Sequence, residues 1–186
     1  MRTLLGGIGY RNLRDHSAGV VLVDHLQCRE WPDEIAVEDV SYNPIAVVQW
    51  LEDEVPERRF GRAVVVGATT RGAGRLPGAV TAYRWDGVLP PDEAIQSAVC
   101  EAVTGVISLD NSLIVARYFR ALPDEVVVVE IEPGAHEFGA AFSPPVELAF
   151  GPLCALVSGL ALDPGAAARL PVAPLGGPMV REAELR

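Results

Sequence analysis

The sequence predicts an α/β fold, a three-layer sandwich in which a mostly parallel, twisted sheet carries helices on both faces. Short apolar stretches alternate along the chain with longer stretches of helical periodicity. One of the apolar stretches, residues 63–68, is a continuous run of the kind that parallel sheets bury on both faces, and the valine-rich residues 125–132 predict another strong strand. Residues 1–162 accommodate these elements as a single domain, and the Pro-, Ala- and Gly-rich residues 163–186 predict a poorly structured C-terminal tail.

The first elements form a β-α unit followed by a second strand and helix. Residues 3–8 predict an apolar strand that runs into a glycine turn, and residues 17–28 predict a helix with one apolar side. Residues 35–41 alternate between apolar and polar side chains, which indicates a strand. Asn43 and Pro44 then offer an N-cap and a first-turn proline, so a helix should follow.

The central strand, residues 63–68, precedes a loop rich in Gly and Arg. Residues 79–85 predict a further strand, and because the connection is too short to hold a crossover helix, we expect that strand to be antiparallel at an edge of the sheet. Residues 91–104 begin at a proline and carry acidic side chains in the first turn, which is typical of a helix. A second helix is predicted from about residue 112 to residue 122.

The last predicted strand, residues 125–132, is followed by a glycine-containing loop over residues 133–143. Pro144 and Pro145 then open a final helix that reaches about Leu160. Polar side chains at the carboxyl ends of the strands would meet at one edge of the sheet, where open α/β sheets place their ligands.

Charge and composition limit which classes of partner the protein can have. The formal net charge is −10 and the isoelectric point is about 4.7, which argues against a nucleic-acid partner, since such binding depends on clustered Lys and Arg. No apolar run reaches transmembrane length free of charge or proline, so no membrane partner is expected. The glycine-rich segments match neither a phosphate-binding loop nor a dinucleotide fingerprint.

The three cysteines suggest a reducing compartment. Cys28, Cys100 and Cys154 form no C-x-x-C pair, their number is odd, and each lies in or beside an apolar run. Buried, reduced thiols explain this pattern better than a disulfide or a metal site. We therefore expect a cytoplasmic protein.

Five short motifs occur in a fixed order along the chain. They are Gly7-Ile8-Gly9 with Asp15 six residues later, Val64-Val65-Val66, Leu76-Pro77-Gly78-Ala79-Val80, the segment 122–133, and Phe142-Ser143-Pro144-Pro145-Val146. This order resembles that of the hydrogenase maturation endopeptidases, whose opening segment is usually written G-I-G-N-x-L-x-x-D-E-G-x-G. The resemblance spans roughly residues 3–160. It implies a phosphorylase/hydrolase-like α/β sandwich and a protein substrate, the hydrogenase large-subunit precursor, from which the C-terminal extension is removed.

The resemblance also implies a metal-recognising site, with altered residues. In that family a Glu of the first loop, an Asp ending the central strand and a His before the penultimate helix recognise the metal. Here His16 and Gly67 stand at the first two positions, and the third region, around Asp110, contains no histidine. The resemblance thus implies His16 and Asp110 as metal ligands. It implies no tightly bound cofactor; the nickel of the precursor is what would be recognised.

The same residues have simpler interpretations. Asp15, Asp110 and Asn111 all precede predicted helices, where side-chain capping explains them without chemistry. Thr69 and Thr70 follow the central strand and are better explained as cleft lining than as nucleophiles. The candidate substrate contacts are Asp15, Gly67, Thr69, Thr70 and Asn111, and no residue is identified as catalytic.

Three residues outside these motifs remain candidates for the same cleft. Arg71 and Arg75 lie in the loop after the central strand, where arginine can bind a peptide carboxylate, although solvation at the surface is the simpler interpretation. His136 lies in the loop after the last strand.

Two functions stay open. The first is a maturation endopeptidase-like enzyme. The second is a proteolytically inactive homologue that acts as a binding or assembly factor for a metalloprotein, which Gly67 favours because glycine offers no carboxylate. An unrelated small-molecule hydrolase ranks last, since the sequence contains no Ser-His-acid signature.

Overall fold

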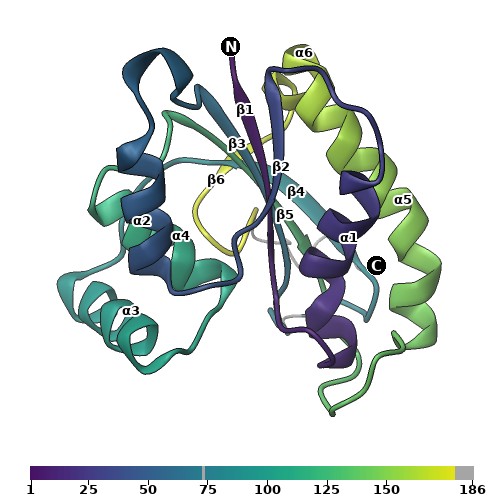
Figure 1. Cartoon of the computed structure of the whole chain (residues 1–186). Helices are drawn as coiled ribbons and strands as arrows, with labels where there is room; N and C mark the ends of the chain where they lie inside the picture. Colours follow the sequence, from purple (N-terminus) through teal and green to yellow (C-terminus); the bar gives the residue numbers. More distant parts are fainter. Residues whose placement is uncertain (73, 179–186) are drawn as a thin grey trace.

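A computed structural model describes residues 1–72 and 74–178 and places six strands in one sheet (Figure 1). The strand order is β2-β1-β3-β5-β4-β6. The bounds are β1 Thr3–Ile8, β2 Ile35–Asp39, β3 Arg62–Ala68, β4 Val80–Trp85, β5 Glu125–Ile131 and β6 Val172–Ala173. β1, β2, β3 and β5 are parallel, whereas β4 is antiparallel to β5. The predicted fold class is confirmed, including the antiparallel strand.

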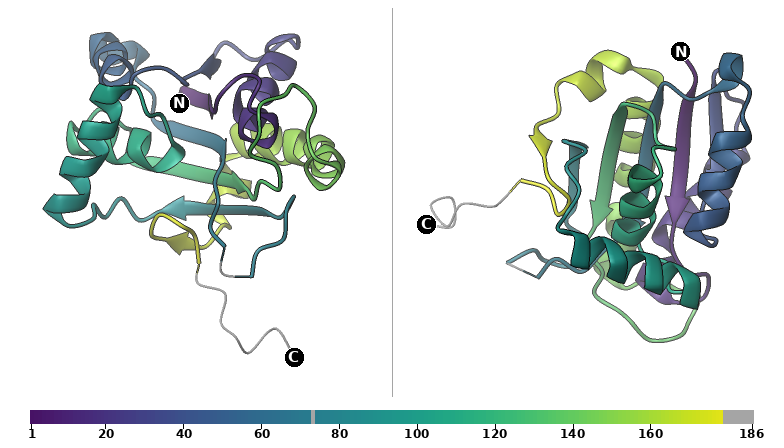
Figure 2. Two further views of the ribbon diagram at one scale, coloured as in Figure 1. Left: turned by 90° about the horizontal axis from the view of Figure 1, so that it is seen from below. Right: turned by 90° about the vertical axis from the view of Figure 1, so that its left-hand side faces the viewer.

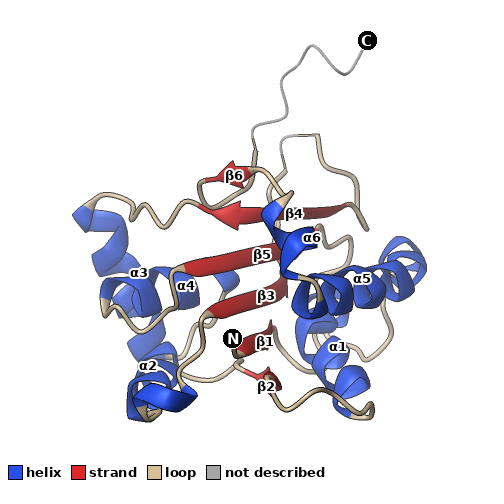
Figure 3. Ribbon diagram, turned by 90° about the horizontal axis from the view of Figure 1, so that it is seen from above, coloured by secondary structure: helices blue, strands red, loops and turns tan. Residues whose placement is uncertain are grey.

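Helices cover both faces of the sheet (Figures 1 and 3). α1 and α5 lie on one face, and α5 is followed by the short α6. α2 and α4 lie on the other face, and α3 packs outside them. The bounds are α1 Ala18–Gln27, α2 Pro44–Asp53, α3 Asp92–Thr104, α4 Leu109–Tyr118, α5 Pro144–Leu162 and α6 Pro164–Ala168; two 3-10 turns are η1 Arg14–Ser17 and η2 Pro56–Arg58. As predicted, the side chain of Asn43 caps α2 by accepting from the N–H of Ile45.

The side chains of the central strands divide between two apolar cores. On β3, Val64 and Val66 pack with α1 and α5, whereas Ala63 and Val65 pack with α2 and α4. Because both faces of the sheet are covered, the first six residues of β3 are all buried. This is why the central strands read as unbroken apolar runs rather than as alternating patterns.

Helix α1 lies directly on the backbone of the sheet, and two glycines allow it. A Cβ atom on Gly19 would lie 2.2 Å from the carbonyl oxygen of Ile8 and 2.7 Å from that of Val66. A Cβ on Gly7 would lie 2.2 Å from the carbonyl oxygen of Gly19. This close approach holds the start of α1, and the loop before it, against the carboxyl ends of β1 and β3.

We expect Gly19→Ala to lower the free energy of unfolding by about 2–3 kcal/mol, because the new methyl group must push α1 away from the sheet. Gly159→Ala is the matched control. It is also helical, and its Cβ would meet nothing within 4 Å, so it should raise the free energy of unfolding by up to about 1 kcal/mol. Chemical denaturation of the two variants measures the difference, and equal stabilities would disprove the close contact.

The second helix of the 91–122 region begins earlier than predicted. α4 starts at Leu109, and Ser108 is its N-cap: the Ser108 hydroxyl accepts from the N–H of Asn111, and the Asn111 side chain accepts from the N–H of Ser108. Neither Asp110 nor Asn111 is therefore the N-cap. The physical reason is Leu109, which is 1% exposed and must lie in the first turn to reach the core.

Part of the predicted tail is structured. Residues 164–178 contain α6 and β6, and Figure 2 shows β6 outside β4 at the edge of the sheet. The small side chains of Ala167 and Ala173 are buried against the two cores, so this Ala- and Pro-rich composition marks close packing rather than disorder. Residues 179–186 lie outside the described part of the chain.

Two other expectations need refinement. Cys154 is buried, whereas Cys28 and Cys100 are exposed, and all three thiols are free within the described residues. Helix α5 is long and apolar enough to cross a membrane by length and composition alone. Its inward side chains, Leu153 and Val157 among them, pack into the core with α1 and the sheet, which is typical of a core helix.

Candidate functional site

A cavity of about 350 Å³ opens at the carboxyl ends of β1 and β3. Three segments line it: the loop after β1, the loop after β3, and the start of α4 with the residues before it. Of the residues predicted from the sequence, His16, Thr69, Thr70, Arg71 and Asp110 line this cavity. The tertiary structure therefore brings together the predicted metal ligands and the two threonines at the expected end of the sheet.

Tyr10 bridges this cavity from one side to the other. Its hydroxyl accepts a hydrogen bond from the N–H of Ile107, which precedes α4. The loop after β1 is thus attached to the loop between α3 and α4, and both loops form cavity walls. Tyr10 stands where the resembled family has an asparagine.

Asp15 is a buried anchor and not a cap or a surface ligand. It is fully buried, and its carboxylate accepts hydrogen bonds from the N–H groups of Gly134 and Ala135 at 2.8 Å and from the N–H and hydroxyl of Ser143 at 2.7 Å. Burial alone would raise the pKa of Asp15, but the hydrogen bonds from Ser143, Gly134 and Ala135 hold it below its usual value. In place of the expected substrate contact, Asp15 ties the first loop to the loop after β5.

This attachment brings His136 to His16. Nε2 of His16 lies 2.8 Å from Nδ1 of His136, so one ring donates a hydrogen bond and the other accepts it. His16 is half-buried, and His136 is exposed. Burial and the neighbouring His136 lower the pKa of His16, against the opposing charge of Asp15. His16 is therefore kept neutral near pH 7, and neutral imidazole is the form that binds metals.

The lowered pKa of His16 predicts how stability varies with pH. Between the pKa of His16 in the unfolded chain, about 6.5, and its lower pKa in the folded protein, the unfolded chain binds more protons. The free energy of unfolding should thus fall as the pH is lowered through about 6.5 toward the folded pKa of His16. We expect His16→Gln to flatten this part of the curve and the exposed His25→Gln to leave it unchanged; equal slopes for both variants would refute the assignment.

Asp110 is bound by an arginine. Both of its carboxylate oxygens accept from the guanidinium of Arg71 at 2.7 Å. Within residues 1–72 and 74–178, no group of three or more His, Cys, Asp and Glu side chains is arranged to hold a metal ion. A metal site made of His16 and Asp110 stays a prediction, and it would have to compete with this ion pair.

Glu130 is the central polar residue that the sequence analysis missed. It lies on β5, is 1% exposed, and accepts from Arg71 at 2.6 Å, from Arg75 at 2.7 Å and from the hydroxyl of Tyr83 at 2.7 Å. Burial would raise the pKa of Glu130, but the bonds from Arg71 and Tyr83 outweigh it and hold the pKa below its usual value. Burial and Glu130 together raise the pKa of Tyr83. Arg71 and Arg75 are therefore ion-paired inside the molecule rather than solvated.

A sequence signal for Glu130 did exist. An acidic residue within a valine-rich strand needs a buried partner, and the loop after β3 supplies two arginines. Gly67 is buried in β3 directly opposite Glu130 in the strand register. It is not among the residues that line the cavity.

Asn111 is also unavailable to a substrate. It is 2% exposed, and its amide nitrogen donates to the carbonyl oxygen of Val106 at 2.8 Å and to Glu101 at 3.3 Å. Together with its bonds to Ser108, these contacts make Asn111 a fixed part of the α3–α4 connection. The expected substrate contact is thus replaced by a structural role.

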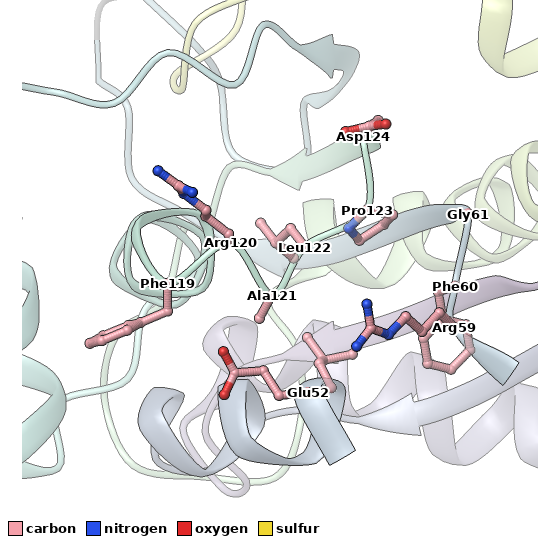
Figure 4. Close-up of a pocket in the computed structure, with 11 residues that line it drawn as sticks. Glu52, Arg59, Phe60, Gly61, Phe119, Arg120, Ala121, Leu122, Pro123 and Asp124 are labelled. Atoms are coloured by element: carbon pink, nitrogen blue, oxygen red, sulfur yellow. The ribbon is translucent and has the colours of Figure 1, made fainter. Parts of the chain in front are cut away.

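A second cavity, of about 470 Å³, lies at the opposite end of the sheet, where β3 and β5 begin (Figure 4). Glu52 and Arg59 lie on one side of it, and Arg120 and Asp124 lie on the other. Two acidic and two basic side chains give it no charge preference. Because ligands of open α/β sheets bind at the carboxyl ends of the strands, the first cavity is the better candidate site.

Comparison with known proteins supports the fold. No protein-family model and no curated protein sequence matches the chain. Among solved structures, the hydrogenase maturating endopeptidase HybD from E. coli superimposes with a TM-score of 0.65 at 20% identity, over 89% of this chain and 94% of that one. The [NiFe] hydrogenase maturation protease HycI from Thermococcus kodakarensis gives 0.62 at 18% identity, over 87% and 93%.

A hydrogenase 2 maturation peptidase from a Thaumarchaeota archaeon gives a TM-score of 0.59 at 24% identity, over 88% of this chain and all of that one. At such identities these likenesses establish a shared fold. The resemblance predicted from the sequence motifs is thereby confirmed at the level of the fold, over nearly the full length of each neighbour.

Proposed function

We propose that this protein is a maturation endopeptidase-like protein that recognises a metal-loaded hydrogenase large-subunit precursor and removes its C-terminal extension. The shared fold with hydrogenase maturation endopeptidases supports this class of function. The observation that carries the proposal is the pair of imidazoles, His16 and His136, on the loops beside the cavity at the carboxyl ends of β1 and β3.

The imidazole pair suits recognition of a metal carried by the substrate. Borderline ions such as Ni²⁺ favour imidazole ligands, and two ring nitrogens only 2.8 Å apart can turn to face one ion. His136 is exposed, whereas His16 is held by the anchored loop around Asp15. His16 and His136 would thus sense the metal of the precursor, while Thr69 and Thr70 contact the segment to be cleaved.

A second candidate function is a proteolytically inactive binding or assembly factor for a metalloprotein. The specific observation in its favour is the ion pair of Arg71 with Asp110, which places a cation on the cavity wall beside the carboxylate. Gly67 adds to it, because glycine provides no side-chain ligand there. This factor would bind the precursor without changing its mass.

The mass of the nickel-loaded precursor after incubation with the protein separates the two functions. Loss of a C-terminal peptide with the native chain, and at least about a tenfold slower loss with His16→Ala and with His136→Ala, supports the endopeptidase. His25→Ala is the matched control and should cleave normally. Processing that is unaffected by the two site variants would refute the imidazole assignment.

Gly67→Asp tests the inactive alternative. A Cβ at Gly67 would lie 3.2 Å from the carbonyl oxygen of Ile8 and 3.5 Å from Cβ of Leu109, so the variant requires the backbone of β1 to shift by a few tenths of an ångström, and its folding is checked first by circular dichroism. If the Gly67→Asp variant cleaves the precursor while the native chain binds the precursor stably and leaves its mass unchanged, the natural protein is a binding factor.

A further inference from the structure

The segment 170–178, called the C-terminal strap below, covers the outer edge of β4 (Figure 3). Its strand β6 is only two residues long and runs parallel to β4. The N–H of Arg84 donates to the carbonyl oxygen of Pro171 at 2.9 Å, and the N–H of Asp86 donates to that of Ala173 at 3.0 Å. The strap is thus attached to the sheet through main-chain atoms, as in β-strand addition.

Beyond β6 the strap turns back along β4, and two fixed side chains bind its backbone. The carbonyl oxygen of Gly176 accepts from Arg75 at 2.6 Å, and its N–H donates to the hydroxyl of Tyr83 at 3.1 Å. Arg75 and Tyr83 also bind Glu130, so the protein interior holds both groups in position. Gly177 has a φ of +77°, a conformation that favours glycine, and a Cβ there would also lie 3.1 Å from Nη2 of Arg75.

Side chains of the strap contribute little to the contact. Ala173 is 4% exposed, but its side chain is a single methyl group, and Val172 is 58% exposed. Leu175 packs on the core that contains Tyr83 and Trp85, and Leu170, at the start of the strap, packs on the core of the opposite face. A contact made of backbone bonds, one methyl group and two partly buried leucines can be reproduced by another extended segment of suitable sequence.

We infer that the outer edge of β4 is a docking edge for an extended peptide segment, and that the strap occupies it as an exchangeable ligand of the same chain. The segment that fits runs parallel to β4, has a small residue opposite Trp85, and has glycine where Gly177 lies. The edge connects to the candidate cavity, because Glu130 binds Arg75, Tyr83 and Arg71, and Arg71 in turn binds Asp110. The inference does not depend on the proposed function.

Binding of a labelled peptide with the sequence of residues 169–178 to the full-length chain tests the docking edge. Ala173→Glu in the protein should expel its own strap, and this variant should bind the peptide saturably, at least about tenfold more tightly than the native chain, whose edge is filled. This increase in affinity should be lost when Tyr83→Phe is added to the Ala173→Glu protein, and also when the peptide itself carries Ala173→Glu. A folded Ala173→Glu protein that does not bind the peptide overturns the inference.

Native-state hydrogen exchange of the unmodified protein tests exchangeability without any variant. The amides of Arg84 and Asp86, which donate to the strap, should exchange by local opening, faster than the amides of Val127 and Val129 in the centre of β5. If all four amides exchange at the rate set by global unfolding, the strap is a permanent strand of the sheet and the inference is wrong.

Discussion

Asp15→Asn is expected to lower the free energy of unfolding by about 3 kcal/mol, although it changes only one atom. Asp15 is fully buried and accepts three main-chain N–H bonds and one hydroxyl bond. An amide retains one acceptor oxygen and directs an NH₂ group at the remaining donors. Each buried donor left without an acceptor costs about 1–3 kcal/mol, and the loss of charge weakens the bonds that remain.

The destabilisation by Asp15→Asn should extend to the loops beside the cavity. Asp15 connects the first loop to residues 133–143, which carry His136, so the imidazole pair depends on it. Ser143→Ala is the control: it removes only the hydroxyl bond and should cost about 1 kcal/mol. Denaturant unfolding monitored by circular dichroism gives both values. A stability of Asp15→Asn within 0.5 kcal/mol of the native protein, about the error of such a measurement, would show that water or loop movement satisfies these donors.

Glu130→Gln should destabilise the protein by about 3–5 kcal/mol, the usual cost of breaking a buried ion pair from one side. The carboxylate of Glu130 is 1% exposed and balances Arg71 and Arg75, whose side chains are 16% and 11% exposed. With a neutral amide in its place, both guanidinium groups remain largely buried, and only Asp110 is left to balance Arg71.

Glu132→Gln is the matched control for this prediction. Glu132 is also buried near the end of β5, but it accepts from the main-chain N–H groups of Arg71 and Gly72, at 3.0–3.3 Å, rather than from a charged side chain. We expect it to cost about 1 kcal/mol. Because the pKa of Glu130 is lowered in the folded protein, its contribution is complete above pH 5 and is lost only as the pH falls through the folded pKa. The deficit of Glu130→Gln should therefore be constant from pH 8 to pH 6, and a deficit that changes over this range would contradict the assignment.

The candidate site was predictable from the sequence only in part. His16, Thr69 and Thr70 follow strands and Asp110 lies in the first turn of a helix, and parallel strands bring such positions to one edge of the sheet, so their meeting at one cavity could be anticipated. The roles of Asp15 and Asn111 could not. A short polar side chain before a helix suits a cap, a ligand and a buried anchor equally well, and only its neighbours in space decide among them.

The local sequence pattern was sufficient to predict the fold. It was insufficient to predict which distant side chains contact one another. The apolar runs, the N-cap at Asn43 and the prolines that open helices determined the α/β class, the element order and the antiparallel β4, because backbone preference and burial act over a few residues. The sequence by itself also determined the family likeness through the order of its motifs.

Only the tertiary structure decided that His16 meets His136, that Arg71 binds Asp110 and Glu130 together, and that the C-terminal strap covers β4. These contacts join residues between 39 and 120 positions apart, and although a buried acidic residue signals the need for a partner, nothing local in the sequence decides which residue that partner is. Their physical origin is the need of each buried charge or polar group for a partner, which the chain satisfies with whichever group the packing of the sheet and helices brings within reach.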